Sequence, residues 1–326
     1  MKSWSRLRAR YGQTRFRLVD INCLVYLGLL AALLVFFHKD TPAWPRYALL
    51  HVAIILVIPE VVRLGERQPR RKVLWFLRTF YPVAILLFGW GEVDVLGRMF
   101  FGSYWATDLI RRAERAIWGG PFAAWFQGLH RPWLDEIMAI FYAGYYLFLI
   151  SAALPLFVKK KYEQTLAVLS MGLFVAFVNY FLFYLIPVLS PAMADAPNQG
   201  QSGAHSGYLV SAFLHFVQSK GSVRGGTFPS SHISEALIWS LAAFRYNRKL
   251  GAVLLAAVPG VVVSTVYLNY HYTLDPLFGL LLAALLYPVA LKIVKARGED
   301  PVGAAISDEP VVDGGLSRAR RGGAGS

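Results

Sequence analysis

The chain has 326 residues, of which 56% are hydrophobic and only 16% are charged. A soluble domain carries about a quarter charged residues, so this composition argues against one. The formal net charge of +14 would also suit nucleic-acid binding. The basic residues fall between apolar blocks rather than in one patch, so we expect a membrane as partner and no nucleic acid.

Eight apolar stretches are each near the length that a bilayer requires. They are residues 18–37, 46–63, 73–90, 133–157, 165–188, 231–244, 250–268 and 276–292. We therefore predict an all-α fold, a polytopic membrane bundle of about eight transmembrane helices. The second and third stretches contain Glu60 and Arg78, for which snorkelling and mutual pairing are both open.

The first stretch follows the basic segment "MKSWSRLRARYGQTRFR" and ends without a small-x-small cleavage site. We interpret it as an uncleaved span rather than a signal peptide. It contains Cys23, the single cysteine of the chain, so neither an intrachain disulfide nor a cysteine-based zinc cluster is possible.

The distribution of lysine and arginine predicts the orientation. With eight spans, 23 of these residues fall on the side of the two termini and nine on the other side. The positive-inside rule then places both termini in the cytoplasm. We expect an integral protein of a bacterial inner (plasma) membrane.

Three segments lie outside the spans. Residues 91–132 combine cations with Trp and Phe, which predicts a helix lying in the membrane interface. Residues 189–229 are mostly polar and predict a loop on the non-cytoplasmic side. We divide the chain into N-terminal transmembrane helices (1–95), a membrane domain (96–295) and a disordered cytoplasmic tail (296–326).

The sixth stretch is preceded by "GGTFPSSH", residues 225–232. A proline near the first helical position leaves the next backbone N–H groups unpaired, and the helix dipole adds partial positive charge. Ser230 and Ser231 add hydroxyl groups, and Arg224 lies just upstream. The pattern predicts an anion site suited to phosphate, with His232 beside it.

A second histidine follows in "STVYLNYHYTLDPLFG", where His271 precedes Asp275 by four residues. On one helix this spacing places both on one face. Alternatively, Asp275 caps a helix that begins at Pro276, and the contact crosses a loop-to-helix junction. On one helix the carboxylate would fix the imidazole tautomer and leave the other ring nitrogen free. Across the junction the sequence allows this contact without requiring it.

Both histidines fall on the non-cytoplasmic face of the predicted topology. An anion site with two histidines and an aspartate predicts phosphoryl transfer through a phosphohistidine. One histidine attacks phosphorus, and the other protonates the leaving oxygen. We expect no metal or other cofactor, because cations and amides would hold the phosphate oxygens.

These motifs resemble those of the type 2 phosphatidic acid phosphatase superfamily. "FPSSH" is similar to its P-S-G-H motif, and "STVYLNYHYTLD" is similar to its S-R-x5-H-x3-D motif. The segment "YWATDLIRRAERAIWGGPFAAWFQGLHRPWLDEIMAIFYAGYY" resembles the branch that includes inositol phosphorylceramide synthases. The resemblance covers roughly residues 100–290.

The resemblance implies a role for each matching residue. His271 would be the nucleophile, Asp275 the residue that orients it, and His232 the general acid. Ser230 and Ser231 match phosphate-binding positions, and the substrate would be a phospholipid or a prenyl phosphate.

Two departures from the family pattern keep a second reading open. The first family motif, K-x6-R-P, is not evident, and its arginine is expected near Ala192. The arginine of the third motif corresponds to Thr265. Arg224 and Lys220 could compensate. Alternatively, the chain is a catalytically impaired member that acts as a lipid-binding or scaffold protein. A transporter is less favoured, because no inverted repeat is visible.

Overall fold

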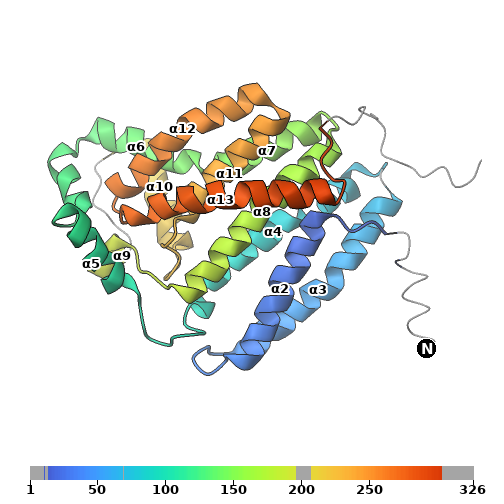
Figure 1. Ribbon diagram of the computed structural model, residues 1–326, viewed down its shortest axis with the longest axis horizontal. Helices are drawn as coiled ribbons and strands as arrows, with labels where there is room; N and C mark the ends of the chain where they lie inside the picture. The colour runs from blue at the N-terminus through green and yellow to red at the C-terminus, as the bar shows by residue number, and fades with distance from the viewer. Residues whose placement is uncertain (1–10, 12–13, 69, 196–206, 303–326) are drawn as a thin grey trace, which may run out of the picture.

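The computed structural model describes residues 11, 14–68, 70–195 and 207–302, and every regular element among them is a helix (Figure 1). The helices are α2 (Leu18–Phe36), α3 (Trp44–Arg67), α4 (Lys72–Leu96), α5 (Thr107–Trp118), the 3-10 helix η1 (Phe122–Leu129), α6 (Pro132–Gly144), α7 (Tyr146–Val158), α8 (Tyr162–Leu185), α9 (Pro191–Asp195), α10 (Leu209–Gly221), α11 (Ser231–Tyr246), α12 (Arg248–Tyr267) and α13 (Leu274–Ala296). The predicted all-α membrane fold is confirmed.

Each of the eight predicted spans coincides with a helix or, for 133–157, with the pair α6 and α7. Six helices are long and apolar enough to cross a membrane, and the α6–α7 pair, bent by 44°, would be a seventh. The remaining helix, α11, has 16 residues and is shorter than a bilayer-spanning helix. The count is therefore six or seven, and the difference from eight lies in α11 and in the bent α6–α7 pair.

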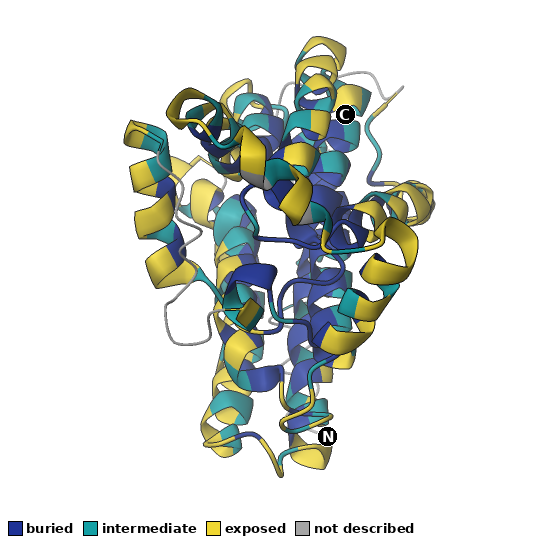
Figure 2. Ribbon diagram, turned by 90° about the vertical axis from the view of Figure 1, so that its left-hand side faces the viewer, coloured by how far each residue is buried: buried dark blue, intermediate teal, exposed yellow. Residues whose placement is uncertain are grey.

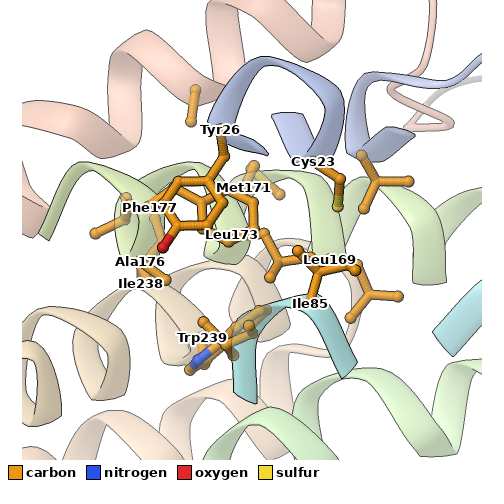
Figure 3. Close-up of a cluster of buried hydrophobic side chains, with 14 of the residues drawn as sticks. Cys23, Tyr26, Ile85, Leu169, Met171, Leu173, Ala176, Phe177, Ile238 and Trp239 are labelled. Atoms are coloured by element: carbon orange, nitrogen blue, oxygen red, sulfur yellow. The ribbon is translucent and has the colours of Figure 1, made fainter. Parts of the chain in front are cut away.

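The core is organised around α8, whose most apolar window is 78% buried. Buried residues concentrate on the inner helices, and exposed ones lie on the outer faces (Figure 2). Tyr26 of α2 stacks on Phe177 of α8 with ring centroids 4.2 Å apart (Figure 3). A Cβ atom at Gly172 would lie 1.9 Å from the Trp239 ring of α11. Only glycine therefore lets α8 and α11 approach this closely.

Glu60 and Arg78, the charges within two of the predicted spans, each form an ion pair with another residue. Arg78 of α4 is fully buried and donates to both carboxylate oxygens of Asp20 in α2, at 2.9 and 2.8 Å. Tyr81 donates to the same carboxylate at 2.6 Å. Glu60 forms an ion pair with Arg63 at 2.7 Å. Arg78 thus binds a carboxylate inside the bundle and does not snorkel.

Several basic segments meet at one end of the bundle. Arg17, just before α2, pairs with Glu163 at the start of α8 at 2.5 Å. The backbone N–H of Leu18 donates to Glu299, which follows α13, at 2.8 Å. The start of α2, the start of α8 and the end of α13 therefore share this end. The side of the membrane that it faces stays a prediction.

Two segments between the spans are helical. Residues 91–132 contain α5 and η1, in line with the predicted helix. Residues 189–229 contain α10, contrary to the predicted loop, because Leu214 and Gln218 are one turn apart and bury one face of the helix against the bundle. In the predicted tail, Asp300 pairs with Arg245 at 2.5 Å. Residues 303–326 lie outside the described residues.

Candidate active site

The site forms where α11 and α13 begin and α12 ends. His271 lies in the short turn between α12 and α13, and Asp275 lies in the first turn of α13. The Nδ1 atom of His271 is 3.2 Å from Oδ2 of Asp275, which also accepts the backbone N–H of Tyr272 at 2.9 Å. The contact crosses a turn-to-helix junction, which is the second arrangement considered from the sequence. α13 begins at Leu274 rather than Pro276.

The opposite nitrogen of His271 faces α11. Its Nε2 atom is 3.3 Å from Oγ of Ser230, and the backbone N–H of Ser230 donates to the carbonyl of Asp275 at 2.9 Å. Burial lowers the pKa of the His271 imidazole to about 3, although a contact with the backbone of Thr227 opposes this shift. The ring is therefore neutral at pH 7. With Nδ1–H directed to the carboxylate, Nε2 carries the lone pair and accepts from the Ser230 hydroxyl.

His232 lies in the first turn of α11, with its ring centroid 5.5 Å from that of His271. Its Nε2 atom is 3.0 Å from the hydroxyl oxygen of Tyr142, to which Nε2 of Gln218 donates at 3.1 Å. The Nδ1 atom is buried and has no hydrogen-bond partner in the part of the chain that the structure describes.

The hydrogen bonds around Tyr142 set the tautomer of His232. An amide nitrogen is a donor only, so the Tyr142 oxygen accepts from Gln218 and its single proton is free for His232. Nε2 of His232 then accepts that proton, which places the ring hydrogen on Nδ1. His232 therefore offers an N–H donor that no described group occupies.

Ser230 and Ser231 stand at the start of α11. Ser230 is the N-cap residue, but its side chain makes no capping hydrogen bond. The N–H groups of the first turn consequently keep their donors for a ligand. Both serines are buried, and Pro229 precedes the N-cap.

A cavity of about 280 Å³ opens onto both histidines and Ser231. One part of its wall is apolar and includes Leu86, Leu87 and Val217. Tyrosines line another part, and Glu235 of α11 accepts from the hydroxyl of Tyr145 there at 2.9 Å. The cavity combines apolar surface with hydroxyl groups, which suits an amphiphile.

The candidate cations of the sequence do not converge on this cavity. Arg224 is exposed, its backbone N–H donates to Asp94 at 3.2 Å, and it does not line the cavity. Lys220 is also exposed and does not line it. Thr265 contributes through its backbone, because its carbonyl accepts the N–H groups of Tyr270 and His271, each at 3.1 Å.

A family model described as the PAP2 superfamily matches residues 109–289, more than half of the chain. The chain belongs to the PAP2 superfamily. No curated protein and no solved structure matched the chain. The match confirms the resemblance at the level of the superfamily, and its range includes both histidines, both serines and Asp275.

Membership in the PAP2 superfamily makes the paired histidines the natural candidate site. Within the described residues, no three His, Cys, Asp or Glu side chains are grouped so that they could hold a metal ion. Sequence reasoning missed Tyr142, Gln218 and Glu235. "FYAGYY" placed Tyr142 in a predicted span, and only the packing of α6, α10 and α11 brings the three side chains to the cavity.

Proposed function

We propose that the chain is a membrane-embedded lipid phosphatase or phosphotransferase that works through a phosphohistidine at His271. The observation that carries this proposal is the orientation of His271. Asp275 holds Nδ1, and Nε2 points toward Ser230 and the start of α11. PAP2 superfamily membership and the mixed apolar and hydroxyl lining of the cavity support the same conclusion.

The proposed reaction has two steps. The Nε2 lone pair of His271 attacks phosphorus, and the bond from phosphorus to the ester oxygen breaks. His232, protonated on both ring nitrogens once the anionic substrate is bound, gives the Nδ1 proton to that leaving oxygen and becomes neutral. In the second step, water or an alcohol attacks the phosphohistidine, His232 takes the proton of the attacking oxygen, and His271 is released. Water gives hydrolysis, and an alcohol gives transfer.

Ser230, Ser231 and the first-turn N–H groups of α11 would hold the phosphate oxygens, and the aromatic and apolar cavity would hold the lipid part. The substrate would be a phospholipid or a prenyl phosphate, and it would reach the site from the non-cytoplasmic face. Transfer of the kind carried out by inositol phosphorylceramide synthases belongs to the same proposal, because the 104–146 segment resembles that branch.

A second candidate is a lipid-binding or scaffold protein that has lost turnover. It is favoured by Ala192 and Thr265, which stand where the family pattern expects arginines. Such a protein would bind a lipid in the same cavity without releasing phosphate.

Phosphate release by the purified protein in detergent separates the two candidates. The substrate panel is phosphatidate, a prenyl diphosphate and a phosphoinositol lipid, each with and without an alcohol acceptor. We expect release that His271→Ala abolishes and that His215→Ala retains, since His215 is exposed on α10 and lines no part of the cavity. Release equal in wild type and His271→Ala would refute the enzyme, and lipid binding without release would favour the scaffold.

A further inference from the structure

The segment where the family pattern expects its first arginine adjoins the turn that carries His271. The backbone N–H of Ala192 donates to the carbonyl of Asn269 at 3.3 Å. A long cation at Ala192 would therefore begin beside the proposed nucleophile, and this chain has only a methyl group there. A phosphate at His271 needs positive charge from another element.

A second cavity, of about 250 Å³, opens beside this same turn. Its lining includes Pro191, Asn269 and His271 on one side and Arg111 and Arg115 of α5 on the other. His271 lines both cavities, so the proposed nucleophile lies between the tyrosine-rich cavity and the arginine-lined one.

The helical repeat of α5 selects which arginines face the second cavity. Arg111 and Arg115 are four residues apart and share one face. Arg112 and Arg115 are both exposed to solvent, but only Arg115 lines the cavity. The cationic face is therefore a defined pair of side chains and not a general property of the basic stretch "RRAER".

α5 is fixed to the turn that carries His271. Oε1 of buried Glu114 accepts the backbone N–H of Thr273 at 2.8 Å and its hydroxyl at 2.9 Å. Trp118 donates to the same hydroxyl oxygen at 2.8 Å. The arginines are thus held at a constant position relative to a residue two places after His271.

Two carboxylates share the second cavity with the arginines. The hydrogen bonds from Thr273 occupy Glu114. Asp195 pairs with Arg111, but its side chain is 62% exposed. Water can therefore solvate the Asp195 carboxylate when a ligand displaces it from Arg111. Arg115 forms no side-chain ion pair or hydrogen bond with any other described residue. A phosphate would find one arginine unpaired and one held by a replaceable surface partner.

We propose that Arg111 and Arg115 bind the phosphate group of the substrate and replace the arginines missing at Ala192 and Thr265. Two guanidinium forks would neutralise a phosphate dianion and fix its oxygens. The phosphate would lie at His271 between the two cavities, and the apolar part would lie in the tyrosine-rich one. This inference rests on the proposed function, and it identifies the cations of that site.

The test measures two quantities for wild type, Arg111→Gln, Arg115→Gln, the double variant and the control Arg112→Gln. The first is the rise in melting temperature of the detergent-solubilised protein with inorganic phosphate. The second is KM and kcat for phosphatidate. We expect each single cavity variant to bind phosphate roughly 10- to 100-fold more weakly, as for loss of a charged hydrogen bond, and Arg112→Gln to match wild type.

Asp195→Asn should tighten phosphate binding, since it removes the competing carboxylate.

The two readouts separate this inference from the proposed function. Phosphate stabilisation that Arg111→Gln and Arg115→Gln remove supports the arginine site even if no variant turns over. The opposite outcome is turnover that depends on His271, with phosphate binding and KM equal in Arg111→Gln, Arg115→Gln and Arg112→Gln. It would overturn the arginine site and leave the proposed enzymatic function standing.

Discussion

At the scale of single residues, the two histidines differ in what holds them. A carboxylate contacts Nδ1 of His271, whereas a tyrosine hydroxyl contacts Nε2 of His232. The first arrangement puts the ring lone pair of His271 on Nε2, and the second puts the ring proton of His232 on Nδ1. Each ring therefore directs toward the substrate the nitrogen that its proposed role requires.

The first prediction concerns His232 and Tyr142. Tyr142→Phe removes the proton that fixes Nε2 of His232 as an acceptor, so the acid proton loses its defined position. We expect kcat to fall about 10- to 100-fold for alkyl phosphates, at the low end of general acid effects. It should change little for nitrophenyl phosphate, whose leaving group needs no acid. His232→Ala should show the same selectivity, more strongly. An equal loss on both substrates would point to a structural defect instead.

The second prediction concerns the pH profile. Because burial lowers the pKa of His271 to about 3, the neutral nucleophile persists as the pH falls. Turnover of nitrophenyl phosphate, corrected for ionisation of the substrate, should stay level from pH 7.5 to about 5. A histidine with the ordinary pKa of about 6.5 would lose about thirty-fold over that range. A fall centred near pH 6.5 would contradict a buried, neutral His271.

The same shift bears on stability. Below about pH 6.5 the unfolded chain gains a proton on this residue and the folded chain does not. The free energy of unfolding therefore decreases as the pH drops through that region.

The residues named from the sequence differ in how far the sequence could fix them. The spacing of His271 and Asp275 predicted their contact on one helix and left it open across a turn-to-helix junction. The junction is what the structure shows, and the contact forms there at 3.2 Å. Arg224 was assigned by its closeness in sequence to Ser230. The chain between them turns at Gly225, where φ is 86°, and Arg224 stays outside the cavity. A residue that lies close to the site in sequence therefore need not direct its side chain into the cavity when such a turn intervenes.

At the scale of elements, the site depends on how closely α11 and α13 approach. A Cβ atom at Gly279 of α13 would lie 2.6 Å from the carbonyl oxygen of Ser230 and 3.2 Å from Cβ of Ile233. Glycine at this position lets the two helix starts meet, and the hydrogen bond from Ser230 to the Asp275 carbonyl depends on that approach.

The third prediction follows from this contact. Gly279→Ala forces α13 away from α11, at a cost of about 1–3 kcal/mol as for other overpacked interiors. We expect a lower melting temperature in detergent and a loss of turnover, since Asp275 moves relative to Ser230. Gly28→Ala in α2 is the matched control, because no atom lies within 4 Å of a Cβ there. Equal behaviour of the two variants would show that the helices can separate without cost.

The break between α6 and α7 was beyond the sequence analysis, which predicted one span over 133–157. Gly144, the last residue of α6, directly precedes the bend at Tyr145, but a single glycine within an apolar stretch does not predict a bend. Instead, the residues around the bend contact α11. Tyr142 of α6 contacts His232, and Tyr145 donates to Glu235. Such bends follow from contacts between distant segments, and local sequence does not contain them.

At the scale of the whole molecule, apolar length predicted the helices well. The eight stretches coincide with the observed helices because a bilayer demands long, internally hydrogen-bonded segments. The arginine-lined cavity was not predicted. The sequence predicted α5 only as an interfacial helix. Its arginines face the second cavity because Glu114 fixes the helix to Thr273.

The fourth prediction concerns topology. The structure brings Arg17, Glu163 and Glu299 to the end opposite the two histidines, and the positive-inside rule assigns that end to the cytoplasm. Cys23 is buried and should not react with the reagent, so any labelling comes from the single introduced cysteine. In intact cells, an impermeant maleimide should label Lys220→Cys and leave Lys160→Cys unlabelled. The reverse pattern would place the site in the cytoplasm.

The central claim is that phosphate passes through His271, and trapping the intermediate tests it most directly. Wild-type protein is quenched in alkali during turnover of phosphate-labelled phosphatidate, digested and analysed by mass spectrometry, with His271→Ala beside it. We predict an acid-labile, alkali-stable phosphate on the peptide that contains His271, and none in the variant. Turnover without a labelled His271 peptide, or turnover that survives in His271→Ala, would contradict the account.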